Sequence, residues 1–150
     1  MNEQEGEADP VAMGFTHVLA NDVASIAPLA ARLAAFGAGQ SIDRRVVEHL
    51  TLALDELLTN VIEHGFADDK PHELRVRIWL EDNSLQAELI DDAAQFDPFR
   101  DAPKPDIAAD AQARPIGGLG VHFVRTLIDN ATYQRAGGRN ILRIGKRLTG

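Results

Sequence analysis

Hydrophobic residues in the middle of the chain recur with the spacing of an amphipathic helix. From residue 42 to residue 64 they follow the i, i+3, i+4 pattern, with Ser41 before them as an N-cap and Gly65 after them as a stop. The same spacing from Ile26 to Phe36 predicts a shorter helix earlier in the chain. The apolar stripe on the long helix is broad, which suits packing against a sheet.

After residue 65 the hydrophobic period changes to two, which is typical of strands. Asp82-Asn83 and Gly137-Gly138 each separate two alternating segments and are residues that favour tight hairpin turns. The predicted strands cover residues 15–20, 74–81, 85–91, 131–135 and 140–146. We therefore expect two antiparallel hairpins, one within residues 74–91 and one within residues 131–146.

A proline-rich segment separates the two predicted hairpins. Residues 97–116 lack an apolar period, so we expect a loop that acts as a lid. The turn Gly117-Gly118-Leu119-Gly120 then opens a third helix, residues 121–129. This element order predicts an α+β fold, a two-layer sandwich in which a mixed, mostly antiparallel sheet carries its helices on one face. We expect residues 14–150 to form this domain and residues 1–13 to form a disordered acidic tail.

The composition narrows the classes of function. The chain has no cysteine, which excludes disulfides, thiolate metal sites and a cysteine nucleophile and favours a cytoplasmic location. Its net charge of −8, from 23 acidic and 15 basic residues, disfavours direct binding of nucleic acid. No apolar run reaches the roughly 18 to 20 residues of a membrane helix. We expect a cytoplasmic protein that binds another protein or a small anion.

Three separate segments carry residues suited to a nucleotide pocket. Glu56, Asn60 and His64 are spaced i, i+4 and i+8, so they project from nearly one face of the long helix. Asp91 ends a half-buried strand, where a carboxylate can accept a hydrogen bond from the amino group of adenine. The glycine turn at 117–120 precedes a helix, whose free N–H groups favour phosphate. Taken singly, the first two also fit simpler roles, a solvent-facing helix row and a turn-initiating Asp, and the glycine turn is only suggestive.

In combination and in this order, these segments resemble a known family. Residues Leu52–Phe66, LALDELLTNVIEHGF, resemble the N box of the GHKL ATP-binding superfamily. Ile90–Phe99, IDDAAQFDPF, is similar to its G1 box, and Arg114–Asp129, RPIGGLGVHFVRTLID, is similar to its G2 box. Asn140–Leu148, NILRIGKRL, is similar to the closing strand. The resemblance covers nearly the whole chain from Phe15 and is greatest to anti-sigma factor serine/threonine kinases of the RsbW and SpoIIAB type.

The resemblance implies a Bergerat-type fold and a role for each matching residue. Glu56 would be the general base, Asn60 would hold Mg²⁺ against the ATP phosphates, and Asp91 would bind the adenine amino group. Further contacts to the nucleotide are implied for His64, Ala93, Phe96, Gly117, Gly118, Leu119, Gly120 and Val121. Ala93 stands where the G1 box has glycine, and a methyl group is unfavourable there if the backbone needs a positive φ or a close approach.

The function implied by the resemblance is that of an ATP- and Mg²⁺-dependent anti-sigma factor. Such a protein phosphorylates Ser or Thr of an anti-anti-sigma (STAS-domain) partner, sequesters a sigma factor and commonly forms a homodimer. Ala93 favours an alternative, a nucleotide-dependent protein-binding regulator without kinase activity. A third hypothesis, the detached ATPase domain of a histidine kinase, is disfavoured by the short lid. Neither direct nucleic-acid binding nor membrane contact is expected.

Overall fold

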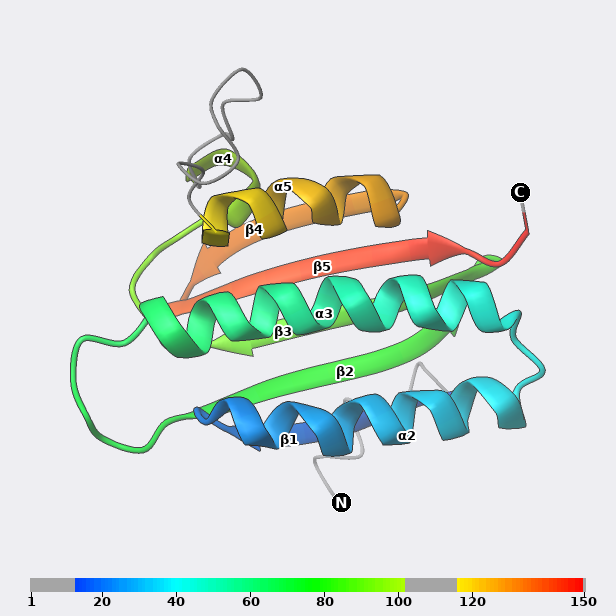
Figure 1. The fold of residues 1–150 in the computed structure, drawn as a ribbon, viewed down its shortest axis with the longest axis horizontal. Coiled ribbons are helices and arrows are strands. Elements are labelled where there is room, and N and C mark those ends of the chain that lie inside the picture. The colour runs from blue at the N-terminus through cyan, green and yellow to red at the C-terminus, as the bar shows by residue number, and fades with distance from the viewer. Residues whose placement is uncertain (1–12, 102–115, 150) are drawn as a thin grey trace.

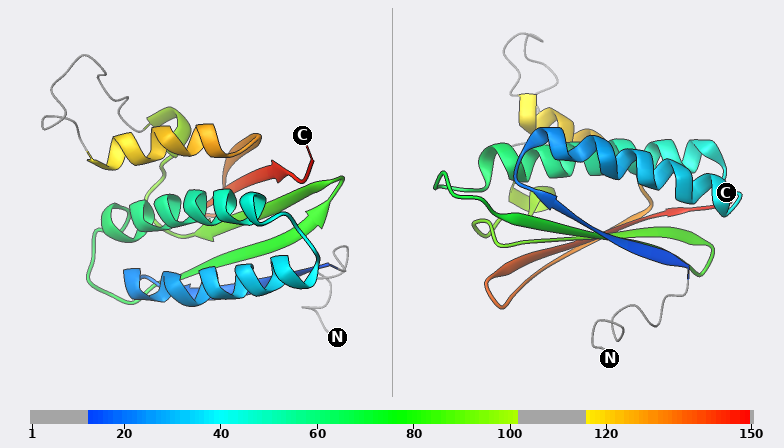
Figure 2. Two further views of the ribbon diagram at one scale, coloured as in Figure 1. Left: turned by 45° about the vertical axis from the view of Figure 1, so that its right-hand side comes forward. Right: turned by 90° about the horizontal axis from the view of Figure 1, so that it is seen from below.

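A computed structural model describes residues 13–101 and 116–149 of the protein. In this part of the chain, helices cover one face of a five-stranded sheet and leave the other face open (Figures 1 and 2). The strands are β1 (Gly14–Ala20), β2 (Glu73–Glu81), β3 (Ser84–Asp91), β4 (Asn130–Ala136) and β5 (Arg139–Arg147). The helices are η1 (Val23–Ser25), α2 (Ile26–Gly39), α3 (Arg44–His64), α4 (Pro98–Asp101) and α5 (Ile116–Leu127). The predicted α+β class and the two layers are confirmed.

The strand order is β1-β2-β3-β5-β4, and all four neighbouring pairs are antiparallel. The expected mixed character is therefore wrong for the described strands. Two of the pairs, β2-β3 and β4-β5, are hairpins with two-residue turns, which can join only antiparallel strands. Asp82 and Asn83 have φ values of 50° and 60°, and Gly137 and Gly138 have 59° and 75°. Positive φ at both central positions is the geometry that matches hairpin twist, so both predicted turns are confirmed.

The long helix α3 begins later than its pattern suggested and has a different cap. Ser41 has a φ of 57° and lies outside the helix. The N-cap is Asp43, whose side chain accepts a hydrogen bond of 2.9 Å from the backbone N–H of Arg45. At the other end, Gly65 caps α3 with an ordinary φ of −87°. A left-handed backbone is therefore not the reason for a glycine at this end of the helix.

The hydrophobic core lies between α2, α3 and α5 and the inner face of the sheet. It is formed by fully buried side chains from all of these elements, among them Leu33, Leu50, Leu58, Val76, Ile78, Val124 and Ile144. Trp79 alternates with Ile78 and therefore lies on the opposite, open face, yet it is only 3% exposed. The guanidinium groups of Arg77 and Arg143 cover it, 4.6 and 5.4 Å from its ring centroid.

Two elements beside the predicted lid differ from expectation. Residues 98–101, expected to be loop, form the single turn α4, which Asp97 caps through a bond of 3.0 Å from the N–H of Phe99. The glycine segment lies in the first two turns of α5 rather than before it, although glycine is a weak helix former. The predicted tail and most of the predicted lid, residues 1–12 and 102–115, lie outside the described residues. In the described ranges, no helix combines the length and apolarity needed to cross a bilayer.

Candidate functional site

A cavity of about 190 Å³ lies between the end of α3, the adjoining ends of β3 and β5, and the segment that follows β3. Its apolar walls come from Leu57, Val61, Leu89, Ala93, Pro98 and Leu142. Its polar groups come from Asn60, His64, Asp91, Tyr133 and Asn140. Ligand pockets commonly measure about 300–1,000 Å³, so this cavity suits one planar ring system better than a whole nucleotide.

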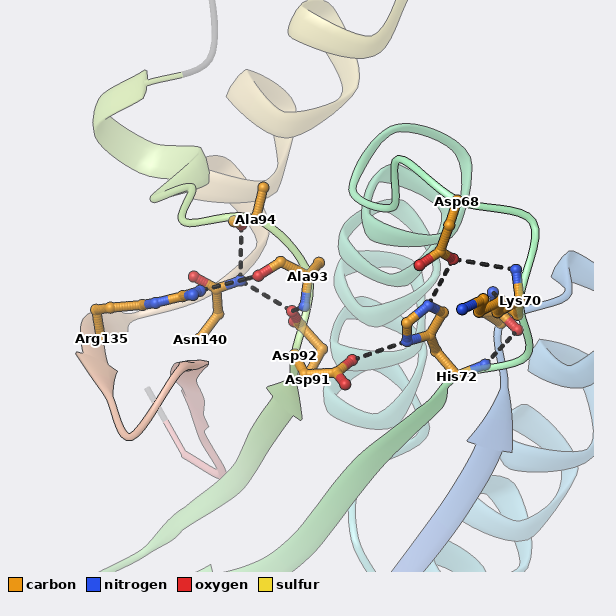
Figure 3. Close-up of polar contacts among 10 residues, drawn as sticks. Asp68, Lys70, His72, Asp91, Asp92, Ala93, Ala94, Arg135 and Asn140 are labelled. Carbon is orange, nitrogen blue, oxygen red and sulfur yellow. Dashed lines mark hydrogen bonds and ion pairs between the residues drawn. The ribbon is translucent and has the colours of Figure 1, made fainter.

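Asp91 supplies the buried charge of the cavity and is 5% exposed. Its Oδ1 accepts hydrogen bonds from Asn140 Nδ2 at 2.9 Å and from the N–H of Ala93 at 3.0 Å (Figure 3). Among the described residues no group donates to Oδ2. Burial raises the pKa of Asp91 above its ordinary value, although the two hydrogen bonds oppose this shift. The bond from Ala93 is that of an Asx turn, so Asp91 both starts a turn and presents a carboxylate to the cavity.

Asn140, at the start of β5, is the residue that holds this site together. Its Nδ2 donates to Asp91 and to the carbonyl of Ala94, the latter at 3.0 Å. Its Oδ1 accepts from the hydroxyl of Tyr133 and, at 3.3 Å, from the N–H of Phe96. Because Asn140 is only 6% exposed and uses both ends of its amide, it fixes β3, β4 and the 93–96 segment relative to one another.

Ala93 fits the site in spite of the expected penalty for a methyl group. Its φ is not positive, and its carbonyl accepts a bond of 2.9 Å from Arg135 Nη1. The methyl group faces Gly65, where an added Cβ would lie 2.9 Å from Cβ of Ala93 and 2.7 Å from the carbonyl oxygen of Val61. Gly65 therefore leaves room for the methyl group of Ala93 at the end of α3. The backbone of Ala93 itself is unstrained.

The three polar residues in a row on α3, Glu56, Asn60 and His64, face two different parts of the structure, the cavity and α5. Asn60 and His64 line the cavity, as does Phe96. In the part of the chain that the structure describes, neither Asn60 nor His64 makes a side-chain hydrogen bond, so the amide of Asn60 keeps its full hydrogen-bonding capacity. Glu56, one turn before Asn60, lies against α5 instead. The simpler reading of this row as purely solvent-facing therefore does not hold for Asn60.

Glu56 and Gly120 are in direct apposition. A Cβ built on Gly120 would overlap Oε1 of Glu56 and lie 2.8 Å from its Cδ. Gly120 is followed by Val121, which is 3% exposed and belongs to the packed face of α5. Both residues lie in the second turn of this helix, where backbone N–H groups bond to carbonyls four residues earlier. Gly117, Gly118 and Leu119 lie in the preceding part of the same helix, and their side-chain surroundings are outside the described structure. The structure therefore brings the G2 glycine beside the acid of the N box.

The donor set of the cavity fits a purine and a magnesium ion. A buried carboxylate with one unused oxygen, between apolar walls, is suited to an exocyclic amine on a flat ring. Mg²⁺ takes few protein ligands and keeps several waters, so one amide such as that of Asn60 fits it when phosphate oxygens complete the shell. No group of three or more His, Asp or Glu side chains in the described ranges forms a metal site by itself.

The sequence did not identify Asn140, Tyr133 or Arg135 as site residues. They belong to the last hairpin, about 40 residues or more beyond the segment they hold, and they lie on strands that looked purely structural. The available signal was Asn140 itself, because asparagine is depleted in strand interiors.

Known proteins share sequence and fold with this chain. Residues 19–146 match the family model described as histidine kinase-like ATPase domain. Among relatives, the serine-protein kinase RsbW of Listeria monocytogenes is 29% identical over 56% of this chain and 55% of its own length. RsbW of Bacillus subtilis is 27% identical over 61% and 59%, and the serine/threonine-protein kinase BtrW of Bordetella bronchiseptica is 29% identical over 62% and 65%. The matches thus span somewhat more than half the length of these relatives.

Solved structures show the same fold. The RsbU and RsbW domains of a Mycobacterium tuberculosis protein match 90% of this chain and 32% of that chain, with a TM-score of 0.63 and 19% identity. The histidine kinase domain of a blue-light activated histidine kinase from Erythrobacter litoralis matches 85% of this chain and 61% of that chain, with a TM-score of 0.53 and 19% identity. Since the family model spans most of the chain and the fold agrees, the chain belongs to the histidine kinase-like ATPase domain family.

Proposed function

We propose that the protein is an ATP- and Mg²⁺-dependent protein serine/threonine kinase. The observation that supports it most strongly is the arrangement of the three segments predicted to act together. Asp91 and Asn60 line one cavity, and Glu56 lies one helical turn from Asn60, against Gly120. The proposed adenine acceptor, metal-binding amide and carboxylate base would thus follow one another from the cavity along α3 to α5.

The adenine ring would occupy the apolar cavity. Oδ2 of Asp91 would accept a hydrogen bond from the adenine amino group, while Oδ1 stays bonded to Asn140 and Ala93. The phosphates would extend past Asn60 to the start of α5, where the N–H groups of residues 116–118, in the first helical turn, have no partner within the helix and favour anions. We retain residues 97–116, a range that includes α4 and reaches the first residue of α5, as a lid over the phosphates.

Glu56 would act as the general base. Its carboxylate accepts the proton of a Ser or Thr hydroxyl as that oxygen forms a bond to the γ-phosphorus of ATP. The bond from the γ-phosphorus to the bridging oxygen breaks, and ADP leaves with the electron pair. Mg²⁺, when bound, neutralises charge on the phosphate oxygens. The protein's own contribution is to orient the nucleotide through Asp91 and Asn60 and to remove the proton through Glu56.

The partners follow from the family resemblance and from the relatives. RsbW and BtrW are named serine or serine/threonine kinases. We infer an anti-anti-sigma STAS-domain protein as phosphoacceptor, a sigma factor as the competing ligand, and a homodimer as the working form. ATP and sigma factors are cytoplasmic, and we place the protein there as well.

The kinase is preferred to the alternative of a regulator that binds without catalysis. Ala93 was the residue that favoured the regulator, and its φ, which is not positive, argues against one of the two grounds for that choice, a strained backbone. The test is incubation of the protein and a STAS partner with ATP labelled at the γ-phosphate. Glu56→Gln should abolish transfer of the label and leave ATP affinity unchanged. Undiminished transfer by this variant would refute the assigned base, and loss of binding as well as transfer would indicate a structural role for Glu56.

A further inference from the structure

The segment between α3 and β2 ends in a histidine whose two ring nitrogens both face carboxylates. Nε2 of His72 lies 2.8 Å from Oδ1 of Asp68, and Nδ1 lies 3.3 Å from Oδ1 of Asp92 (Figure 3). Ionised carboxylates only accept hydrogen bonds, and a neutral imidazole carries one N–H. Only the imidazolium can therefore donate to both Asp68 and Asp92 at once.

The ring is held in this position from several sides. It stacks on Phe66, with ring centroids 4.3 Å apart and an interplanar angle of 18°. The backbone of His72 is paired with Asn21, through a bond of 3.0 Å to Oδ1 and one of 3.1 Å from the N–H of Asn21. The side chain is 18% exposed. The position of the imidazole is thus set by the fold, independently of Asp92.

Asp92 lies between the two residues that shape the adenine cavity, Asp91 and Ala93. It is 54% exposed, and His72 is the group of the described structure that engages its side chain. Next to it, the N–H of Ala94 donates to the carbonyl of Gly65 at 3.1 Å. The segment after β3 is thereby joined to the segment after α3 at two points, one through the main chain and one through His72.

We propose that His72 is a positioning residue for the nucleotide site, where its positive charge ties Asp92 to Asp68 and so fixes the Asp91–Ala93 turn against the end of α3. This inference depends on the proposed function for its ligand. When the imidazole loses a proton, the remaining N–H stays with the shorter contact to Asp68, and the lone pair of Nδ1 faces the carboxylate of Asp92. Nucleotide affinity should then fall.

The charges around His72 set the direction of its titration. The hydrogen bond with Asp68 raises the pKa of His72 above its ordinary value, and the charge of Asp92 acts in the same direction. His72 and Asp92 line a second cavity, separate from the adenine cavity, and four further charged side chains line it, namely Glu73, Arg75, Asp91 and Arg139. Lys70 lies in the same segment as His72 and its N–H donates to Asp68. Affinity should therefore be highest below the raised pKa and decrease as the pH rises through it.

The experiment is calorimetric titration of the full chain with ADP and Mg²⁺ at about pH 6 and about pH 9. His72→Arg keeps a permanent cation with several donors, and Asp92→Asn removes the negative charge that faces Nδ1 while leaving His72 to titrate. Between about pH 6 and about pH 9, the affinity of wild type for ADP should decrease about two- to fivefold more than the affinity of either variant. This factor corresponds to the interaction energy of a partly exposed ion pair. His17→Gln, on β1 beside Arg32, is the matched control and should keep the wild-type dependence.

An equal pH dependence in wild type, His72→Arg and Asp92→Asn would overturn the inference, because a merely structural histidine would not act through Asp92. Absence of ADP binding by every protein would instead refute the proposed function. In that case the amide NMR signals of Ala93 and Ala94 still decide the inference. In wild type, the chemical shifts of these two amides should change over the same pH range in which the ring of His72 titrates. Amide signals that stay constant over that range would overturn the inference.

Discussion

Asp91→Asn separates the two tasks that the structure assigns to this side chain. Asparagine keeps an oxygen that can accept from Asn140 and from the N–H of Ala93, so the turn can persist. In place of Oδ2, however, it presents an NH₂ group to the cavity. A donor would then face the amino group of adenine, and the hydrogen bond that we assign to the carboxylate cannot form.

The size of the loss follows from the kind of bond that is removed. A hydrogen bond to a charged group contributes about 1.5–3 kcal/mol, which corresponds to a decrease in affinity of about 10- to 150-fold. Stability should not follow affinity. The folded protein holds the Asp91 proton more tightly than the unfolded chain, because burial raises its pKa from the ordinary 3.8. The resulting stabilisation exists below that ordinary pKa and is lost as the pH rises through the raised one.

At neutral pH, therefore, wild type has the cost of a buried charge that Asp91→Asn lacks. We expect the free energy of unfolding of the variant, measured relative to that of wild type, to increase from about pH 4 to about pH 7. Calorimetric titration with ATP and Mg²⁺ measures the affinity, and urea denaturation at the two pH values measures the stability. Asp55→Asn, an exposed position on α3, serves as the control for both. Wild-type affinity in a folded Asp91→Asn protein would refute the assignment of the adenine acceptor.

Two further predictions concern the frame of the site. Gly65→Ala should destabilise the protein by about 1–3 kcal/mol, because its Cβ meets the Val61 carbonyl and the Ala93 methyl group. Adding Ala93→Gly to this variant should recover part of the lost stability. If urea denaturation shows that the losses of the two single variants simply add in the double variant, the contact is contradicted. Asn140→Ala should cost about 2–3 kcal/mol by leaving buried partners such as Tyr133 without a bond, and a loss below about 1 kcal/mol in the same assay would show that they find other partners.

Local patterns were enough to predict most of the architecture. The stripe of α3 and the alternation in β2 and β3 recur over many residues, and the turns Asp82-Asn83 and Gly137-Gly138 have residues that tolerate positive φ. The cap of α3 could not be decided in this way, because Ser41 and Asp43 are both good N-cap residues two positions apart. Ser41 instead ends the preceding helix α2: it is the left-handed residue after the C-cap Gln40, and the N–H groups of Ser41 and Ile42 donate to the carbonyls of Ala38 and Gly37 at 3.2 and 2.9 Å. This leaves Asp43 to cap α3.

The candidate site was predictable where helix spacing, a strand end and a glycine segment marked its residues and the family resemblance suggested their roles. Glu56, Asn60 and Asp91 were identified in this way, and the cavity now joins two of them. Asn140 and His72 were not identified. Asn140 acts through Asp91, a partner remote in sequence, and His72 faces a pair of carboxylates that come close to it only in the folded sheet. The mixed sheet was mispredicted because the element order alone does not fix the direction in which β5 joins β3.

The location of Trp79 provides a convenient optical probe. It is the single indole of the chain, it is shielded from water by arginine side chains, and the sheet separates it from the cavity. Its fluorescence should shift to longer wavelengths when the domain melts and stay nearly constant when a ligand fills the opposite face. Emission from this one fluorophore therefore gives unfolding curves for all the variants above without interference from bound nucleotide.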